Sequence, residues 1–301
     1  MTTNMTRREF SFAALAMAVA GGKAKADPVR YKIVDAQIHV WVNDPRYPWA
    51  AGAANPPKEN RTPAMALELM KANGVERTVI AQYIGYKWDN RYCLDAIKSY
   101  APYFRGVCRV DPTDPAAPDQ LSQLTEQGFH GVRISPTADA AGDWINGPLM
   151  PPLWKRAQSL RIPMQVYAPI TRMPDLVHLI EQCPHLTVVI DHMADCPVDR
   201  PQELEKLIAL ARYPRVFVKI SHTWSISRQP YPWLDAQEHV KRLHAVYGPQ
   251  RLMWASDWPV DLTWTTYDKT LSVVRDDMKF LNADDKSWIL GLTAQQVWPF
   301  A

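Results

Sequence analysis

Residues able to take up or donate a proton follow several short apolar runs of this sequence. Aspartate and histidine matter most among them, because a carboxylate that faces histidines can draw a proton from water. Imidazole N–H groups can in turn polarise a carbonyl oxygen and stabilise the negative charge that develops there. Together these side chains predict a catalytic centre formed by His39, His192, His222 and Asp257.

A second group of side chains near the same positions suits substrate binding. Two arginines can hold an anionic group through parallel hydrogen bonds, and aromatic rings can form the walls of a pocket. Structural roles remain open, because an arginine can pair with a carboxylate of the protein and aromatic rings can simply pack as a lid. The residues predicted to bind substrate are Trp41, Arg109, Arg133, Tyr167 and Lys219.

The elements that must position these side chains are short β-branched runs that alternate with helical patterns. The runs occupy residues 32–36, 77–81, 104–110, 131–134, 163–167, 187–191, 216–220 and 252–255. Helical periodicity covers residues 64–73, 119–127, 153–160, 175–182, 202–212 and 236–247. Strands that alternate with helices form a parallel sheet, and eight of them can close into a barrel. We therefore expect an α/β fold, a single-domain (β/α)₈ TIM barrel with its reactive groups at the carboxyl ends of the strands.

An open, doubly wound sheet is the structural alternative. Such sheets often carry a glycine-rich phosphate loop after the first strand, and this sequence has none there. The stretch from residue 41 to residue 61 is instead rich in proline and aromatic residues, which is typical of a long loop. Long loops at this end of a barrel commonly shape the substrate pocket, so the barrel is the expected fold.

The first 26 residues differ in character from the rest of the chain. Arg7-Arg8 precede an apolar run over residues 10–20, and Ala24-Lys25-Ala26 follows with a small-x-small pattern. These are the parts of a secretory signal, and the paired arginines are typical of twin-arginine export. We predict that residues 1–26 form a cleaved signal peptide, that residues 27–301 form the barrel domain and that the mature protein is periplasmic.

The charge balance of the chain limits its partners. The 301 residues carry a formal net charge of +3, and 22% of them are charged, without a dense run of lysine and arginine after the signal. Such a chain does not suit nucleic acid or, once the signal is removed, a membrane surface. We expect a small-molecule substrate, and a homo-oligomer remains open.

Cys183 and Cys196 flank the run 187–191, which holds them too far apart for a disulfide.

Short motifs, taken in their order along the chain, resemble a known family. They are Asp35-x-x-x-His39-x-Trp41, Ile190-Asp191-His192, Val218-Lys219-Ile220-Ser221, Ser256-Asp257-Trp258-Pro259 and Ile289-Leu290-Gly291. The chain is similar over almost its whole mature length to the amidohydrolase-related barrels, and within them to the lactonase-like branch of sugar-acid lactonases and pyrone-dicarboxylate lactonase. The resemblance implies an amidohydrolase-type TIM barrel that opens a lactone or related cyclic ester of an anionic or polyhydroxylated small molecule. Water would be activated by Asp257.

The resemblance also bears on a metal. The family usually starts with His-x-His, but Gln37 stands at the first of these positions, and Tyr167 stands where metal-binding members often have histidine. Another departure is His222, at a position where the lactonases usually have glycine. Zinc needs three strong ligands and an open position, so the resemblance implies no cofactor or a weakly bound divalent metal such as zinc. Carried over, the metal ligands are His39, His192, Asp257 and, as a weak neutral donor, Gln37.

Two other functions remain open. A metal-dependent nonoxidative decarboxylase of an aromatic or dienoic acid occurs in the same group, but that chemistry depends on a firmly held metal. A catalytically inactive barrel acting as a binding module would explain the loss of histidine at two family positions. The retention of Asp257, which has no evident value for ligand binding alone, favours an enzyme.

Overall fold

The computed structural model describes Met1 and residues 32–53, 56–135 and 144–300. Apart from Met1, the predicted signal peptide lies outside these residues. The described residues include eight short strands, each overlapping a predicted β-branched run, although β1 begins and ends two residues later than the run 32–36. The strands are β1 (Val34–Ile38), β2 (Arg77–Ala81), β3 (Phe104–Val107), β4 (Val132–Ile134), β5 (Met164–Val166), β6 (Val188–Ile190), β7 (Val216–Ile220) and β8 (Leu252–Trp254).

Neighbouring strands pair in parallel and in sequence order. β1 to β3 form one sheet, and β4 to β8 form a second. Parallel bridges join the two sheets at both sides, between Cys108 and Val132 and between Ile38 and Trp258. The bond from His39 N to Trp258 O, 2.6 Å long, strengthens the second of these joins. The strands therefore form the predicted TIM barrel.

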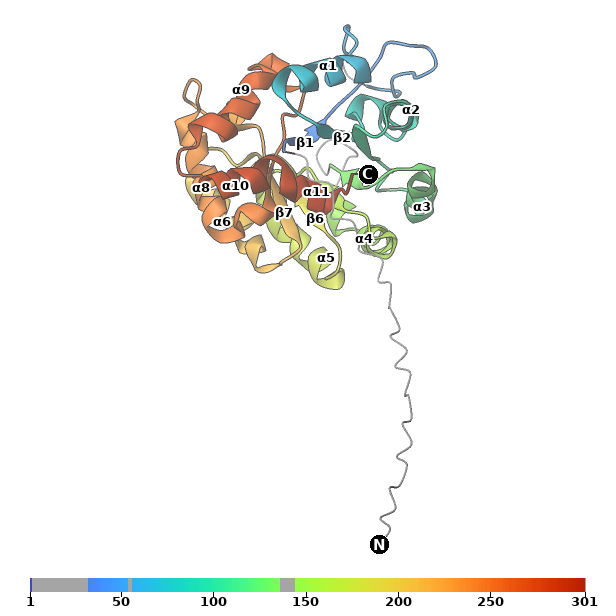
Figure 1. The fold of residues 1–301 in the computed structure, drawn as a ribbon. Coiled ribbons are helices and arrows are strands. Elements are labelled where there is room, and N and C mark those ends of the chain that lie inside the picture. Colours follow the sequence, from blue (N-terminus) through green and yellow to red (C-terminus); the bar gives the residue numbers. More distant parts are fainter. Residues whose placement is uncertain (2–31, 54–55, 136–143, 301) are drawn as a thin grey trace.

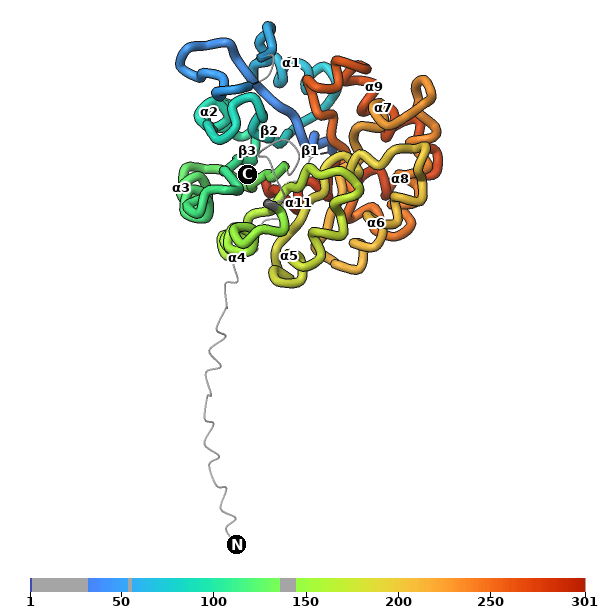
Figure 2. The backbone as a smooth tube through the Cα atoms, turned by 180° about the vertical axis from the view of Figure 1, so that it is seen from behind, coloured from blue at the N-terminus to red at the C-terminus, as the bar shows by residue number. Residues whose placement is uncertain are grey.

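Helices surround the ring of strands, and α11 (Thr293–Val297) lies across one end of it, as Figure 1 and the reverse view in Figure 2 show. The sequence did not predict α2, although its buried residues Cys93, Ala96 and Ile97 have the spacing of a one-sided helix. The α-helices of the described residues are α1 (Pro63–Asn73), α2 (Arg91–Ser99), α3 (Ala117–Gln127), α4 (Met150–Leu160), α5 (Val177–Gln182), α6 (Glu205–Ile208), α7 (Thr223–Ile226), α8 (Leu234–Tyr247), α9 (Tyr267–Ser272), α10 (Ala283–Ser287) and α11 (Thr293–Val297).

The bounds of α1 follow from its local sequence. The side chain of Thr62 accepts the N–H of Met65, and Pro63 fills a first-turn position where no N–H is needed. Gly74 ends the helix in the left-handed region with φ 71°. The chain can then turn directly into β2, which begins three residues later.

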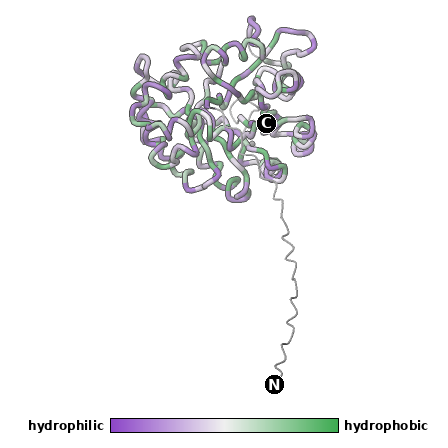
Figure 3. The backbone as a smooth tube through the Cα atoms, in the orientation of Figure 1, coloured by the Kyte–Doolittle hydropathy of each residue, from purple (hydrophilic) through white to green (hydrophobic). Residues whose placement is uncertain are grey.

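Two apolar cores stabilise the barrel. The larger lies between the strands and the surrounding helices. The smaller fills the inside of the barrel and combines strand residues such as Val34 and Ala36 with Trp298, which follows α11 and is fully buried. Figure 3 shows hydrophobic residues gathered towards the interior and hydrophilic residues on the outer loops. Trp298 thus plugs the amino-terminal end of the barrel.

All four cysteines of the chain are free and buried. This agrees with the prediction that Cys183 and Cys196 are not bridged to each other. Among the described residues, no helix combines the length and the apolar character needed to cross a bilayer.

Candidate active site

An irregularity in β1 brings Gln37 to the mouth of the barrel. The register between β1 and β2 is regular up to Asp35 and shifts before Ile38, so that Ala36 and Gln37 together oppose one residue of β2. A bulge of this kind re-aims the side chains of the bulged strand. The Asp35 carboxylate accepts the backbone N–H of Gln37 at 3.1 Å and that of Ser256 at 3.0 Å. Asp35 therefore fixes the bulge and ties β1 to the segment that follows β8.

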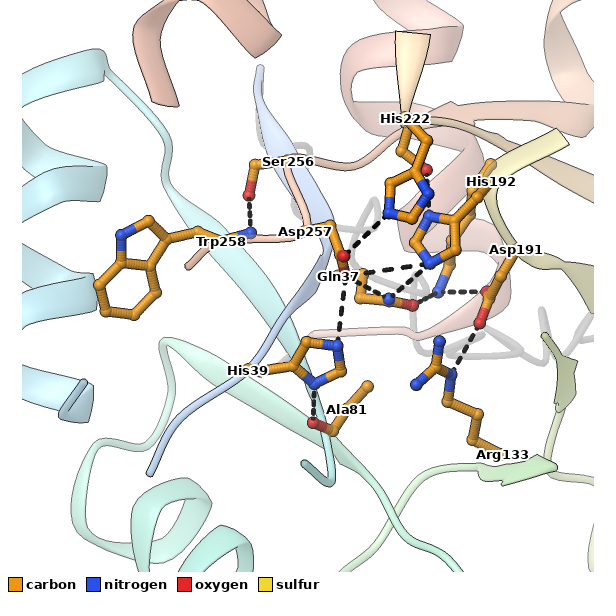
Figure 4. A network of polar contacts seen from close by, with 12 residues as sticks. Gln37, His39, Ala81, Arg133, Asp191, His192, His222, Ser256, Asp257 and Trp258 are labelled. Atoms are coloured by element: carbon orange, nitrogen blue, oxygen red, sulfur yellow. Dashed lines mark hydrogen bonds and ion pairs between the residues drawn. The ribbon is translucent and has the colours of Figure 1, made fainter. Parts of the chain in front are cut away.

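The segments that follow β6, β7 and β8 begin or continue in a left-handed backbone. His192, His222 and Asp257 have φ values of 54°, 61° and 60°. Residues other than glycine adopt this conformation at a cost of about 1–2 kcal/mol each, and such strain concentrates at functional sites. The side chains of these three residues point towards one another (Figure 4). The backbone after the strands, rather than the strands themselves, therefore assembles this part of the site.

Asp257 is the centre of the hydrogen-bond network. Its side chain is nearly inaccessible, and it accepts bonds from Gln37 Nε2 at 2.6 Å and His222 Nε2 at 3.0 Å. His39 Nε2 lies 3.2 Å from the same carboxylate. Burial acts to raise the pKa of Asp257, but the hydrogen bonds from His222 and His39 oppose it, and the pKa lies well below its usual range. The carboxylate is therefore ionised at neutral pH.

The neighbours of Gln37 fix the orientation of its amide. Lys219 can only donate and bonds Oε1 at 2.6 Å, whereas Asp257 can only accept and takes the Nε2–H at 2.6 Å. Lys219 also pairs with Asp191 at 3.0 Å and is fully buried. The prediction that Lys219 contacts substrate is thereby corrected, because its ammonium group is used in holding Gln37 and Asp191.

His192 accepts a hydrogen bond where the prediction expected it to donate one. Its Nε2 lies 3.3 Å from Nε2 of Gln37. The amide nitrogen can only donate, so His192 Nε2 must accept. Nδ1 of His192 lies 2.7 Å from Ser221 Oγ. The imidazole is therefore neutral, in agreement with burial, which lowers the pKa of His192 to about 3. This ring orients Gln37 and stacks on His222, with centroids 3.6 Å apart and planes inclined by 5°.

Both ring nitrogens of His222 face carboxylates. Nδ1 is 2.7 Å from Asp195 Oδ1, and Nε2 is 3.0 Å from Asp257 Oδ2. Because carboxylates only accept, both nitrogens carry a hydrogen and the ring is a cation. Burial disfavours this cation, but the bonds to Asp195 and Asp257 outweigh it and raise the pKa of His222 to about 9. Sequence reasoning missed Asp195, whose only signal is its place three residues after His192.

The two predicted arginines have different surroundings. Arg133 lies beside the network (Figure 4), where its Nε donates to Asp191 at 2.8 Å. Arg109 is fully buried, with Nη1 3.1 Å from Ser135 Oγ and its guanidinium 5.7 Å from the ring centre of Trp88. The structural alternative considered for Arg133 is thus realised, and a role of either arginine in substrate binding stays a prediction.

Aromatic rings surround the histidines. Tyr167 contacts His192 edge-on, with centroids 5.2 Å apart, and its ring lies under the guanidinium of Arg133. Tyr83, which was not predicted, stands edge-on to His39 at 5.8 Å. Trp41 packs against Tyr83 at 4.3 Å. Tyr83 therefore lies between Trp41 and His39, and the role of Trp41 in substrate binding stays a prediction.

Comparison with known proteins places this architecture in a family. The family model described as amidohydrolase matches residues 34–300. The chain belongs to the amidohydrolase family. The family and the fold expected from the sequence are therefore confirmed.

Two relatives and one solved structure illustrate this membership of the amidohydrolase family. The L-fucono-1,5-lactonase of Burkholderia ambifaria is 29% identical over 197 residues, which are 64% of this chain and 68% of that protein. The 4-sulfomuconolactone hydrolase of Hydrogenophaga intermedia is 26% identical over 232 residues, 75% of this chain and 74% of that protein. A crystal structure of a Burkholderia multivorans amidohydrolase with bound zinc is 20% identical to this chain, with a TM-score of 0.77. The match covers 89% of this chain and 99% of that one.

A zinc site needs three strong ligands whose lone pairs converge on one point at about 2.0–2.1 Å. His192, His222 and Asp257 offer ligand atoms that all lie within 4.8 Å of one another. The two imidazole rings are stacked, however, and the lone pair of an imidazole nitrogen lies in the plane of its ring. Parallel rings stacked face to face cannot direct both lone pairs at one ion, so this cluster does not fit zinc.

The ligand set implied by the resemblance, His39, His192, Asp257 and Gln37, does not fit zinc either. Gln37 turns its NH₂ group towards Asp257 and His192, and its oxygen is bonded to Lys219. An amide nitrogen carries no lone pair suitable for a metal. Gln37 is therefore corrected as a neutral oxygen donor, because the position of the first family histidine presents N–H donors to the site, and the roles of His39, His192 and Asp257 as metal ligands stay a prediction.

Proposed function

We propose that this amidohydrolase hydrolyses a lactone or related cyclic ester that carries anionic or hydroxyl groups. The observation behind the proposal is the ionised carboxylate of Asp257, held at the carboxyl ends of the barrel strands by Gln37, His39 and His222. Two relatives named as an L-fucono-1,5-lactonase and a 4-sulfomuconolactone hydrolase support this substrate class. Asp257 takes a proton from water while the water oxygen attacks the carbonyl carbon.

His39 assists from one side of this carboxylate. Its Nδ1 lies 2.7 Å from the carbonyl oxygen of Ala81, which fixes the orientation of the ring, and its Nε2 is directed at Asp257. Because a carbonyl oxygen and a carboxylate only accept, each ring nitrogen carries a hydrogen in this arrangement. The Nε2–H polarises the substrate carbonyl and stabilises the charge that develops on its oxygen. Arg133 lies beside the network and suits an anionic group of the substrate.

We propose that the reaction needs no resident metal. The His222 cation supplies positive charge beside Asp257, and His39 and Gln37 add N–H donors. The stacked rings of His192 and His222 and the amide orientation of Gln37 support this proposal, because stacked rings do not direct their lone pairs at one ion and the amide of Gln37 turns its N–H groups towards the site. Residues of the chain itself thus supply the charge stabilisation that a Lewis acid would otherwise supply.

Nonoxidative decarboxylation is the weaker candidate. It depends on a firmly held metal, and the site lacks the converging ligands for one. A barrel that only binds a ligand has no use for a buried ionised carboxylate, which is costly to desolvate. Both alternatives therefore rank below lactone hydrolysis.

A parallel assay tests the proposed function. The mature protein is offered sugar-acid lactones and unsaturated carboxylated lactones, with acid release as the readout, and aromatic acids, with CO₂ release as the readout. We expect ring opening without CO₂ release, and an unchanged rate for the exposed-site control Asp199→Asn. Release of CO₂, or failure to open any lactone, would contradict the proposal.

We also propose that the protein is exported to the periplasm by the twin-arginine route. The support is Arg7-Arg8 followed by the apolar run and Ala24-Lys25-Ala26. Mass spectrometry of exported protein should show a chain that begins near residue 27. An intact Met1, or export unaffected by Arg7→Lys with Arg8→Lys, would contradict this.

A further inference from the structure

His222 is the most exposed of the histidines around Asp257. It is 7% exposed, against 4% for His39 and 1% for His192. The two oxygens of Asp257 face different groups: Oδ1 lies next to Gln37 and His39, and Oδ2 lies 3.0 Å from His222 Nε2. One side of the carboxylate thus faces the groups that hold it, and the other faces a ring that already carries two hydrogens.

We propose that His222 donates a proton to the ring oxygen of the lactone as that oxygen leaves, and that Asp195 is the positioning residue for this step. The inference rests on the proposed function. Opening a lactone releases an alkoxide, which leaves readily only if a proton reaches it as the bond breaks. The Nε2–H of His222 is a cationic donor beside the carboxylate that receives the proton of water.

The protons balance within the site. Attack of water forms a bond from its oxygen to the carbonyl carbon, and one water proton passes to Asp257. The bond from the carbonyl carbon to the ring oxygen then breaks, and its electron pair stays on that oxygen, which takes the Nε2 proton of His222. Asp257 returns its proton to His222 Nε2 across the 3.0 Å contact, and both groups are restored. The product is a hydroxy acid, which ionises in solvent.

Asp195 keeps the ring of His222 ready for this transfer. It ends a run of left-handed residues with φ values of 54°, 51°, 56° and 46° from His192 to Asp195. Its 2.7 Å contact holds a hydrogen on Nδ1, so that the ring can lose and regain the hydrogen on Nε2. The neutral ring of His192 stacks on the ring of His222 and presents its π face to the His222 cation.

Changing the leaving atom tests this role. A lactone and the thiolactone of the same ring differ in one atom, and a thiolate leaves without a proton because a thiol is much more acidic than an alcohol. We expect the wild type to open both, and His222→Gln to lower kcat for the lactone by about two to four orders of magnitude, the range for a lost proton donor. For the thiolactone the loss should be about tenfold or less, because little of that contribution is needed.

Asp195→Asn keeps the shape of the side chain and gives a second variant. It should show the same preference for the thiolactone, with a kcat loss for the lactone of roughly tenfold to a hundredfold and little change in KM. His39→Gln is the matched control, since it acts at the carbonyl and should slow both substrates by similar factors. Circular dichroism checks that each variant is folded.

The outcomes separate this inference from the proposed function. Equal losses of His222→Gln on the lactone and the thiolactone would overturn the acid role and leave the hydrolase intact. If that variant does not fold, equal losses of Asp195→Asn would overturn it in the same way. Failure of the wild type to open any lactone would instead remove the proposed function itself.

Discussion

The two ends of the barrel interior are built by the same strands from opposite kinds of side chain. At the amino-terminal end, small and branched apolar residues such as Val34 and Ala36 pack around Trp298. At the carboxyl-terminal end, buried polar groups around Asp257 are joined by hydrogen bonds and charge. Lys219 lies at the boundary, with Nζ 5.5 Å from the ring centre of Trp298 and 2.6 Å from Gln37 Oε1.

The difference shows how one barrel divides stability from chemistry. The apolar end gains free energy from burial and needs no partner for its side chains. At the polar end, the left-handed backbone lowers stability. The buried charges there lower it as well unless each charge is paired. Substitutions at the two ends should therefore separate changes in the free energy of unfolding from changes in turnover.

The largest expected effect on the free energy of unfolding is at the apolar end. Trp298→Ala removes the plug and leaves a cavity between the strands and the end of α11. We expect the free energy of unfolding to fall by about 3–5 kcal/mol, the range for a buried tryptophan, while kcat of the folded fraction stays near the wild-type value. Denaturant titration and activity at low temperature measure the two quantities.

Trp264→Ala is the matched control for this prediction. Trp264 is 66% exposed, so its removal should change the free energy of unfolding by no more than about 0.5 kcal/mol. Similar losses in the two tryptophan variants would contradict the account of the plug.

The next effect concerns Arg133 at the polar end. Arg133→Ala should raise KM for an anionic lactone by roughly 10- to 150-fold, because a charge-assisted pair contributes about 1.5–3 kcal/mol. Asp191 keeps its contact with Lys219 in this variant. Neutral lactones should show a much smaller rise, and Arg156→Ala, a change at the surface, should show none. An equal rise for neutral and anionic lactones would remove Arg133 from the binding role.

The order of the elements could be predicted because it follows from local pattern. The runs 77–81 and 216–220 match β2 and β7 residue for residue, since turn-forming residues delimit them. β3 was predicted to reach residue 110 but ends at Val107. The reason is tertiary: Cys108 leaves that sheet to bridge to Val132 and close the barrel.

The members of the site could be predicted better than their contacts. His39, His192, His222 and Asp257 lie together as expected, because the carboxyl ends of parallel strands meet at one end of a barrel. The orientation of Gln37 could not be predicted. It depends on a bulge held by a backbone hydrogen bond that the Asp35 carboxylate accepts, and the approach of Asp195 similarly depends on strained backbone. No spacing in the sequence specifies either feature.

A smaller effect, on the pH dependence of stability, is expected from Asp261, a buried carboxyl group close to Asp257. Neither of its oxygens has a hydrogen-bond partner among the described residues. Burial, with the charges of Asp257 and Asp35, raises the pKa of Asp261 to about 8. An unfolded aspartate has a pKa of about 3.9, so between these values the folded state binds the proton more tightly and stability falls as pH rises.

Asp261→Asn should remove this dependence. Burial raises the pKa of Asp35 to about 6, so Asp35 titrates at the lower edge of the window from pH 6 to pH 8, and His222, with a pKa raised to about 9, contributes equally to both proteins. The difference between the wild type and the variant in this window therefore isolates Asp261. We expect Tm of the wild type to fall across that window and Tm of the variant to fall less. The same slope in both proteins would show that Asp261 is not held protonated.

The most direct test of a metal-independent carboxylate mechanism is kcat on one lactone substrate in four samples. These are the wild type and Asp257→Asn, each stripped with a chelator and each supplemented with zinc. We predict that stripping leaves the wild type active and that Asp257→Asn loses about two to four orders of magnitude in either state, the range for a lost general base. A stripped wild type that is inactive and regains activity with zinc, or an Asp257→Asn variant that remains active, would contradict the account.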